Sequence, residues 1–380
     1  MQMSSNLQGQ YLIIGVFISP RHARCLLTQN KEFINSHRYI RYLELAKANR
    51  SHNILLYFFT HDDVYFDKQT VAGIFYNREH NSWHKNNFPF PHYLYDRGGG
   101  RGKKAEHIIT VFSKLGIKNI NALHYFDKWD LYEKLTKIDA VSSYLPFTVP
   151  GDYSLIPEML ARYGHIYVKA RRGSCGLGVM RLEELPDKQN IRFYYSRFDK
   201  LFSNVLKKEK IPELLQRFFA HHPFIIQEPI NLLKKHNRIV DFRSEVQRNG
   251  EGNLVITGTT ARIGRPRSPI ASNTYAEDYY PLNIFFKKIM KFNNMQFSLM
   301  DAKINHFLKT VFLAVEEAYG SFAEIGIDFG LDTNGRPWLI ECNSKSARVA
   351  LYLAYGRQKV RQSFCNLLDY AGFLAESKAE

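Results

Sequence analysis

The feature that most constrains the fold of this chain is the segment at residues 324–343, which has the pattern of a β-hairpin. The dipeptide Asn334-Gly335 near its centre favours a two-residue turn, because both central positions of such a turn take a positive φ. With these two residues as the loop, Asp328 stands opposite Glu341. Strand alternation then places these apolar residues on one face: Ile325, Ile327, Phe329, Leu331, Trp338, Ile340 and Cys342.

The opposite face of the predicted hairpin carries Asp328, Glu341 and Asn343. Two adjacent carboxylates repel each other unless a cation neutralises them, and carboxylate and amide oxygens suit a hard cation such as Mg²⁺. This face therefore predicts a magnesium site. The alternative is a hairpin with a hydrated polar face, and a loop of odd length would break the register and move Asp328 to the other side.

The composition indicates a globular protein with more than one domain. At 380 residues with 45% apolar and 14% aromatic content, the chain can form about two or three domains with apolar cores. Its apolar runs are too short to cross a bilayer, and its first residues lack the pattern of an export signal. The four cysteines lack the spacing of a zinc site or a disulfide framework. We therefore expect a cytoplasmic protein without a membrane span.

The chain is strongly basic, with a formal net charge of +16. The positive residues fall in short, separate groups at residues 97–104, 169–172 and 262–267, and no nucleic-acid-binding motif accompanies them. Nucleic-acid binding is therefore not favoured. Attraction of an anionic substrate, or a solvated surface, explains the charge instead.

The order of apolar runs predicts the division into domains. In the first third of the chain, short apolar runs alternate with helical patterns, which is typical of a small α/β domain with parallel strands. We expect this N-terminal domain at residues 1–120 and a larger α+β region at residues 121–380. Within the larger region we expect a smaller lid lobe at about residues 150–230 and a metal-bearing lobe at about residues 231–380. Asp127 is predicted to cap a helix at the start of this region.

A glycine-rich loop lies between two predicted strands at residues 166–182. Such a loop can fold over phosphate groups and offer them main-chain N–H groups, while Lys169 on the first strand reaches the phosphate oxygens. The loop matches neither a Walker loop nor a dinucleotide fingerprint. An ordinary wide hairpin turn is the alternative.

The segment at residues 224–230 is an apolar strand that ends in polar residues and a proline. Main-chain groups at such a strand end can pair with the edge of adenine, and Glu228 can accept hydrogen bonds from a ribose or from the amino group of the base. The alternative is an ordinary buried strand that runs into a surface loop.

Charged residues alternate along the predicted strand at residues 240–246, where Asp241, Arg243 and Glu245 share one face. An arginine held by carboxylates presents its planar guanidinium group to a phosphate or a carboxylate. Arg262 ends another predicted strand. Surface ion pairs would explain this pattern equally well.

Taken together, these elements resemble the ATP-grasp superfamily, and most closely its YheC/YheD group, which is described as spore-coat associated in endospore-forming bacteria. The resemblance runs from about residue 95 to residue 348 and is most specific at residues 126–129, 240–243 and 326–345. It implies an α+β ATP-grasp fold, in which two lobes clasp ATP, preceded by a small N-terminal α/β domain. It also implies association with the spore, in addition to the cytoplasmic location expected above.

The resemblance implies roles for particular residues. The residues that it implies for binding ATP are Lys128, Lys169, Gly173, Ser174, Gly176, Gly178, Gln227, Glu228, Ile230 and Asp241. The residues that it implies for catalysis are Arg243, Lys169 and Arg262. The residues that it implies for holding Mg²⁺, or Mn²⁺ in its place, are Asp328, Glu341 and Asn343.

The reaction that the resemblance implies is ATP-dependent ligation through an acyl-phosphate. A carboxylate attacks the γ-phosphate, and an amine or another nucleophile then captures the acyl group. This chemistry depends on positioning and charge neutralisation more than on a general base, and the chain has no motif for a nucleophilic triad. Two alternatives are an ATP-binding structural or regulatory protein without ligase turnover and a kinase of a non-carboxylate acceptor.

Two positions depart from the pattern of related ligases. A glycine pair often follows the asparagine of the acceptor region, but here the sequence after Asn273 is Thr-Tyr-Ala-Glu. A proline often follows the strand lysine, and this chain has Ala170 instead. The first departure concerns the acceptor site. The carboxylate and the nucleophile are therefore not identified, and the basic surface leaves an anionic polymer or peptide open as the acceptor.

Overall fold

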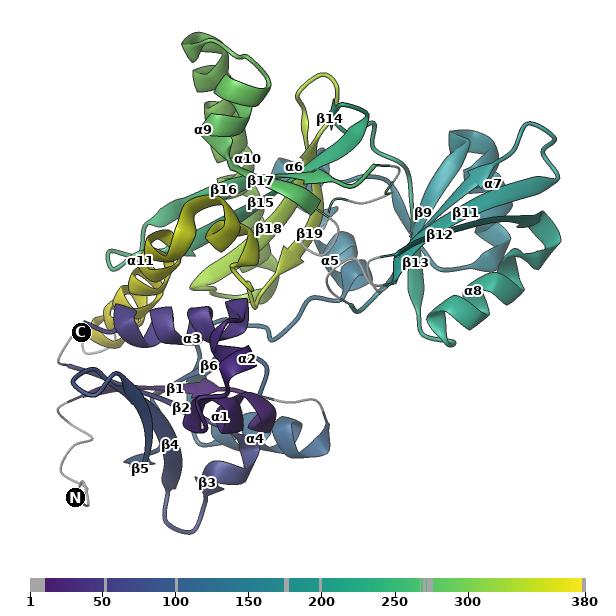
Figure 1. The fold of residues 1–380 in the computed structure, drawn as a ribbon. Helices are drawn as coiled ribbons and strands as arrows, with labels where there is room; N and C mark the ends of the chain where they lie inside the picture. The colour runs from purple at the N-terminus through teal and green to yellow at the C-terminus, as the bar shows by residue number, and fades with distance from the viewer. Residues whose placement is uncertain are drawn as a thin grey trace.

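The structure, a computed structural model, describes residues 11–50, 53–99, 102–173, 178–197, 200–266, 268, 271 and 276–377. These residues form three β-sheets in chain order, each covered by helices (Figure 1). The first sheet spans residues 12–119, the second residues 148–227 and the third residues 234–343. The fold is α+β, with 39% helix and 34% strand. The domain bounds expected from the sequence remain predictions.

The first sheet is parallel on one side and antiparallel on the other. Its parallel strands are β1 (Leu12–Phe17), β2 (Ile54–Phe59), β6 (Tyr93–Asp96) and β7 (Lys118–Asn119). Its antiparallel extension beside β2 consists of β3 (Val64–Tyr65), β4 (Thr70–Asn77) and β5 (Ser82–Pro89). The helices of this part are α1 (Pro20–Leu27), α2 (Lys31–Ile34), α3 (His37–Ala48) and α4 (Lys103–Lys114). Helices α3 and α4 bury their apolar sides against separate cores on the two faces of the sheet.

The second sheet is antiparallel and has the order β12-β11-β10-β9-β13-β8. Its strands are β8 (Thr148–Pro150), β9 (His165–Ala170), β10 (Val179–Glu184), β11 (Asn190–Arg197), β12 (Lys200–Lys207) and β13 (Phe224–Gln227). Helices α7 (Ile156–Tyr163) and α8 (Ile211–Phe219) share its apolar core. We call this unit the second lobe.

The third sheet is built around the hairpin predicted from the sequence. Its strands are β14 (Lys234–Lys235), β15 (Arg238–Arg248), β16 (Leu254–Gly264), β17 (Ala276–Pro281), β18 (Glu324–Leu331) and β19 (Pro337–Asn343). Its core includes residues of α5 (Lys128–Leu135), α6 (Asp139–Ser142), α9 (Leu282–Ile284) and α10 (Asn294–Tyr319). Short helical turns also occur at His61–Asp63, Tyr153–Leu155, Lys208–Lys210 and Phe285–Ile289. We call this unit the third lobe.

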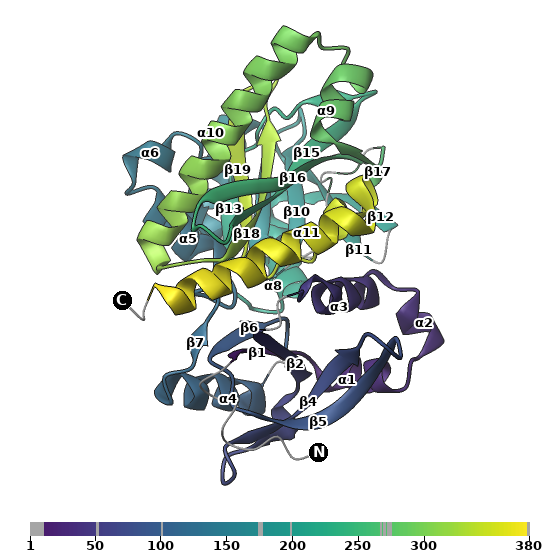
Figure 2. The same cartoon turned by 90° about the vertical axis from the view of Figure 1, so that its left-hand side faces the viewer.

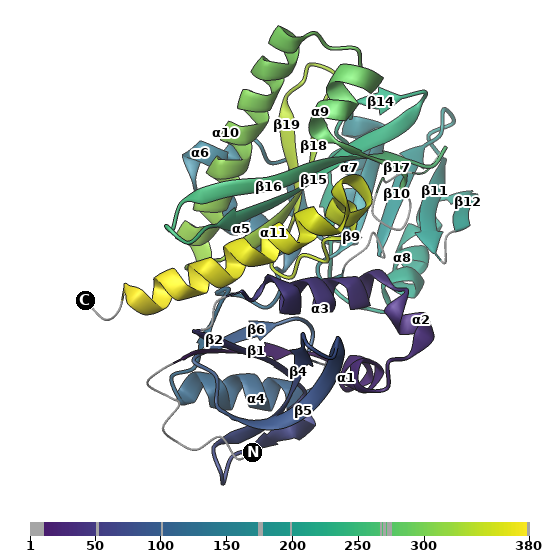
Figure 3. The same ribbon diagram turned by 60° about the vertical axis from the view of Figure 1, so that its left-hand side comes forward.

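The unit built on the first sheet is called the N-terminal part. The last helix, α11 (Val349–Glu376), joins the third lobe to it. It packs against β15 and β16 and also against α3. Figures 2 and 3 show α11 running between the third sheet and the N-terminal part. Most of its buried residues belong to the same core as Ile14 and Val16 of β1 and the buried side of α3. The N-terminal part and the third lobe therefore share a continuous apolar interface.

The predicted two-residue turn is wrong. Strand β18 ends at Leu331 and β19 begins at Pro337, so the loop has five residues. The side chain of Asp332 holds this loop, because its Oδ1 accepts hydrogen bonds from the main-chain N–H groups of Asn334 (2.9 Å) and Arg336 (3.0 Å). Of the two turn residues predicted, only Gly335 has a positive φ.

A bulge in the hairpin restores part of the predicted register. Near the loop, Leu331 pairs with Pro337 and Phe329 pairs with Leu339. Each partner on β19 lies one residue before the predicted one. The register then shifts between Asp328 and Phe329, and Asp328 faces Glu341 as predicted. The predicted apolar face is consequently wrong near the loop: Leu339 is in the core, while Trp338 and Ile340 are only half-buried.

Candidate active site

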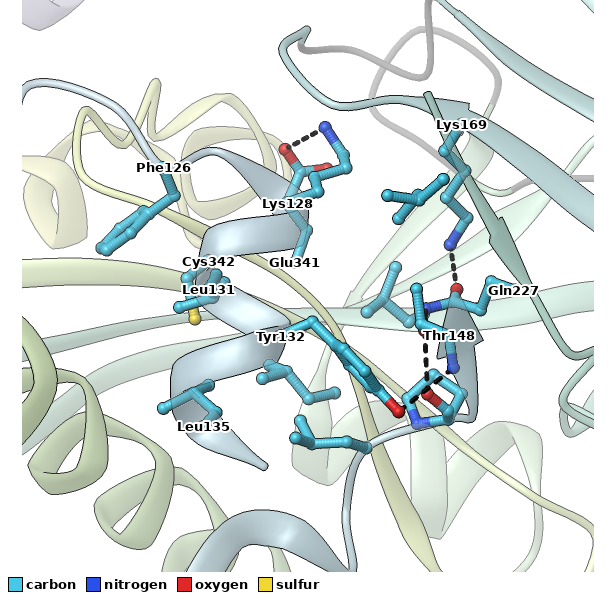
Figure 4. Close-up of a pocket in the computed structure, with 15 residues that line it drawn as sticks. Phe126, Lys128, Leu131, Tyr132, Leu135, Thr148, Lys169, Gln227, Glu341 and Cys342 are labelled. Carbon is cyan, nitrogen blue, oxygen red and sulfur yellow. Dashed lines mark hydrogen bonds and ion pairs between the residues drawn. The ribbon is translucent and has the colours of Figure 1, made fainter. Parts of the chain in front are cut away.

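A pocket with an empty volume of about 520 Å³ lies between the second and third lobes. It is lined by α5, β9, β13 and β19, through residues that include Lys128, Lys169, Gln227 and Glu341 (Figure 4). Apolar side chains such as Leu131 and Ile225 line other parts of the wall, together with Tyr132 and Thr148. The structure therefore gathers predicted site residues from two lobes around one cavity.

Two lysines reach this pocket from different elements. Lys128 is the first residue of α5, which is capped by Asp127 as predicted. Its Nζ lies 3.5 Å from Oε1 of Glu341 and donates to the carbonyl oxygen of Gly173 at 3.3 Å. Lys169, near the end of β9, donates to Oε1 of Gln227. Burial lowers the pKa of Lys169 to about 8, and the charge of Lys128 acts in the same direction.

The strand end at Gln227 is held by a series of hydrogen bonds. Gln227 donates from Nε2 to Oγ1 of Thr148 at 2.9 Å, and the N–H of Thr148 donates to the hydroxyl of Tyr132 at 3.2 Å. Glu228 pairs with Phe147, since its carboxylate accepts from the main-chain N–H of Phe147 at 2.7 Å. Among the described residues that line the pocket, Gln227 is present, but Glu228 and the predicted adenine-pocket residue Ile230 are not.

The glycine loop is described only at its two ends. Gly173 accepts the bond from Lys128, and Gly178 accepts a hydrogen bond from the N–H of Ala170 at 2.8 Å. Gly178 has φ +79°, a conformation that favours glycine. Ser174 and Gly176 lie outside the described residues, as does Asn273 of the acceptor region. Their phosphate and acceptor roles remain predictions.

Asp328 on β18 is held by two arginines, one from the adjacent strand β15 and one from β16 beyond it. Arg243 of β15 donates from Nη1 to its Oδ2 at 2.8 Å, and Nη2 of Arg262 on β16 lies 2.9 Å from its Oδ1. Arg262 also donates from Nε to Asp241 at 2.6 Å. Burial raises the pKa of Asp241 to about 7, while Arg262 opposes this shift. The alternating charges predicted on β15 thus form a buried ion network rather than surface pairs.

The chain leaves room for the Arg243 guanidinium at Gly326. A Cβ atom at this position would lie 2.1 Å from Nη2 of Arg243. We expect Gly326→Ala to displace Arg243 and to lower the free energy of unfolding by about 1–3 kcal/mol, measured by urea denaturation. The control is Gly372→Ala in α11, where no atom lies within 4 Å of the added Cβ. Equal stability changes in the two variants would contradict this reading of Gly326.

The three predicted metal ligands lie together on the hairpin. Asn343 donates from Nδ2 to Oδ2 of Asp328 at 3.0 Å, and Glu341 is the cross-strand partner of Asp328. Burial raises the pKa of Glu341, Lys128 opposes the shift, and the negative charge of Asp328 adds to it. Two carboxylates and an amide oxygen are the hard donors that Mg²⁺ prefers. In this structure, Arg243 and Arg262 pair with Asp328, and Lys128 pairs with Glu341.

The protein donors alone do not complete such a site. Within the described ranges, no three His, Cys, Asp or Glu side chains form a group that could hold a metal ion. Mg²⁺ in nucleotide sites is commonly held by one or two carboxylates together with phosphate oxygens. The donor set therefore fits a cation that binds together with a nucleotide.

Comparison with known families identifies the fold. The family described as YheC/D like ATP-grasp matches residues 116–374, more than half of the chain. The chain belongs to the YheC/D-like ATP-grasp family. The predicted fold and the predicted resemblance are both confirmed.

Two curated relatives come from Bacillus subtilis (strain 168). Endospore coat-associated protein YheC is 26% identical over 334 residues, which are 85% of this chain and 89% of YheC. Endospore coat-associated protein YheD is 25% identical over 301 residues, which are 75% of this chain and 63% of YheD.

Solved structures with the same fold include two amino-acid ligases. VanG D-Ala:D-Ser ligase from Enterococcus faecalis aligns with a TM-score of 0.55 and 14% identity, over 95% of this chain and 100% of VanG. D-alanyl-alanine synthetase A from Vibrio cholerae aligns with a TM-score of 0.52 and 12% identity, over 94% of this chain and 99% of the synthetase. At this level of identity the likeness concerns the ATP-grasp fold alone.

Sequence reasoning missed a serine that joins the site of this YheC/D-like protein to its N-terminal part. Ser346 donates from Oγ to Glu245 at 2.6 Å and accepts from Nη2 of Arg243 at 3.2 Å. Its carbonyl oxygen accepts a hydrogen bond from Arg97, which follows β6. No local motif signals this link, because Arg97 and Ser346 are 249 residues apart.

None of the helices described in this chain is both long enough and apolar enough to span a membrane.

Proposed function

We propose that this protein is a Mg-ATP-dependent ligase that activates a carboxylate as an acyl-phosphate. The observation that carries the proposal is the pocket shared by two lobes, with Lys128 and Lys169 beside the carboxylate pair of the hairpin. Paired cations suit a polyphosphate, and adjacent carboxylates suit the cation that accompanies it. Membership of an ATP-grasp family and a fold shared with ligases support the same assignment.

In the proposed reaction, an oxygen of the substrate carboxylate bonds to the γ-phosphorus and the bond to the β-phosphate oxygen breaks, releasing ADP. A nucleophile then attacks the acyl carbon, loses its proton, and phosphate leaves. Lys128 and Lys169 would bind phosphate oxygens, and Arg243 and Arg262 would orient the γ-phosphate or the acceptor. Asp328, Glu341 and Asn343 would hold Mg²⁺, which neutralises charge on the phosphates when bound.

The organisation that we propose for this activity has an N-terminal domain at residues 1–120, a lid at about residues 150–230 and a metal-bearing lobe at about residues 231–380. The three sheets support these bounds. The names of YheC and YheD support a spore-associated location beside the cytoplasmic one. Those names also favour the second candidate, an ATP-binding structural or regulatory protein without ligase turnover.

The test measures ADP release with Mg-ATP across pools of amino acids, peptides and cell-wall precursors. We expect one pool to stimulate ADP release, and Glu341→Gln to reduce the stimulated rate by about 100-fold or more, because it removes a metal ligand and its charge. Hydroxylamine should trap the acyl group of a ligase, whereas a kinase would leave a stable phosphorylated product. If the protein bound ATP but no pool stimulated ADP release, the result would contradict the ligase and favour the structural alternative.

Nucleotide affinity should depend on the protonation of Lys169. Burial lowers the pKa of Lys169 to about 8, so the free protein loses this positive charge as the pH rises through that value. Binding of ATP then requires uptake of a proton, and we expect the affinity to fall by up to about tenfold per pH unit above pH 8. Titration with a fluorescent ATP analogue between about pH 7 and pH 9.5 measures this. Lys169→Arg should remove this pH dependence of the ATP affinity, because arginine stays charged over the whole range. If the affinity of the variant fell with pH as steeply as that of the wild type, another group would be responsible.

A further inference from the structure

Strand β12 forms an edge of the second sheet. It pairs with β11, and no second strand partner occurs in the part of the chain that the structure describes. Seven of its eight residues are exposed. The exposed fractions of its side chains include 40% for Leu201, 40% for Phe202 and 42% for Val205. An edge strand of this kind presents a row of main-chain groups to which another extended chain can add.

The register shows which main-chain groups of β12 point outward. The N–H of Lys208 donates to Gln189 at 2.9 Å, next to the register pair formed by Asn190 and Lys207. In an antiparallel ladder, residues alternate between facing the partner strand and facing away. The residues of β12 whose main-chain groups face away from β11 are therefore Leu201, Ser203, Val205 and Lys207. Consistent with this, the N–H of Val205 donates to the side chain of Asn204 at 2.8 Å.

The two sides of β12 differ. Phe202 stacks on Tyr195 of β11 with ring centroids 5.1 Å apart, and Leu206 packs against the core of the second lobe. Leu201, Ser203 and Val205 alternate with these residues and face the other way. An added strand would thus meet uncharged side chains at the centre of β12.

The charge of the hairpin formed by β11 and β12 determines which kind of chain can add to its edge. Residues 190–207 contain four basic residues, Arg192, Arg197, Lys200 and Lys207, and one acidic residue, Asp199. Lysines commonly protect edge strands, but here they flank the uncharged run at residues 201–206 and do not interrupt it. Pairing of β12 with β12 of a second copy would bring lysines of the two copies together, which is unfavourable. An acidic chain would be attracted instead.

We propose that β12 is a docking edge to which an extended acidic peptide segment of a partner protein adds as a further strand. Main-chain hydrogen bonds to Leu201, Ser203 and Val205 hold the segment, and the lysines at both ends of β12 attract its carboxylates. The inference does not depend on the ligase activity, because β12 lies at the edge of the sheet, three strands from Lys169 on β9.

The test uses the full chain and a fluorescein-labelled probe, acetyl-Glu-Val-Glu-Val-Glu-Val-Glu-amide, followed by fluorescence anisotropy. We expect binding that weakens as salt is added. Val205→Pro removes an outward N–H without removing a bond to β11, and it should weaken binding by about tenfold, whereas Val205→Thr keeps the N–H and should bind as the wild type does. Circular dichroism checks that the proline variant folds.

A second arm leaves the protein unchanged. Two versions of the probe carry N-methyl groups on either the valine or the glutamate amides, so that each blocks one edge of the peptide strand. Strand addition predicts that one version loses binding and the other keeps it. Equal binding of both versions, equal binding by Val205→Pro, or no binding at low salt would overturn the proposal. Sedimentation would also overturn the proposal if the wild-type protein formed a dimer and Val205→Pro were a monomer. That result would show that β12 pairs with a second copy of the chain.

Discussion

Glu324→Ala is expected to lower the free energy of unfolding by about 3–5 kcal/mol, because it leaves two buried arginines without their carboxylate. Glu324, at the start of β18, is 1% exposed. It accepts a hydrogen bond from Tyr95 at 2.7 Å, lies 3.5 Å from Arg97, and pairs with Arg348. Removing one partner of a buried ion network costs far more than removing a surface pair.

Urea denaturation followed by circular dichroism measures this effect, with Glu317→Ala as the control. Glu317 is an exposed glutamate of α10, so its replacement should change stability by less than about 0.5 kcal/mol. Because Glu324 contacts residues of both the N-terminal part and the third lobe, its loss should also loosen their interface. A loss of stability no larger than that of the control would show that the arginines find other partners or water.

Lys169→Ala is expected to weaken ATP binding by about 10- to 100-fold. The lysine reaches the pocket beside Gln227, and a charge-assisted hydrogen bond to a phosphate is worth about 1.5–3 kcal/mol. Isothermal titration with a non-hydrolysable ATP analogue and Mg²⁺ measures the change.

The matched control for this prediction is Lys210→Ala on the same lobe. Lys210 is exposed and forms an ion pair with Glu213 of α8, 3.6 Å away. It should leave the affinity unchanged. Unchanged affinity in Lys169→Ala would place the phosphates elsewhere in the molecule, and it would remove the main support for the proposed ATP site.

The sequence predicted those parts of the site that depend on local patterns. Alternation along β18 and β19 placed Asp328 and Glu341 among the polar positions, but they face each other as predicted only because a bulge between Asp328 and Phe329 offsets the longer loop. The loop of the same hairpin was predicted incorrectly, since the side chain of Asp332 stabilises a longer loop than Asn334-Gly335 favours. The bulge that compensates for it leaves no signal in the sequence.

Contacts between distant segments could not be predicted. The ion pair between Arg97 and Glu324 joins residues 227 positions apart, and in the sequence Arg97 was only one member of a basic group. The antiparallel strand β5 was missed for a different reason. It is mostly polar, and it buries little more than Trp83 and Phe88, so it lacks the apolar alternation of a typical strand.

The bond between Phe147 and Glu228 has a consequence for motion. The chain enters the second lobe at Phe147 and leaves it at Glu228, and the two residues are joined by hydrogen bonds in both directions. The two crossings are thus paired at one place in the chain, while α11 packs against both the third lobe and the N-terminal part. A rotation about this pair would move Lys169 relative to Glu341 without breaking either sheet, and would therefore change the width of the pocket between the two lobes.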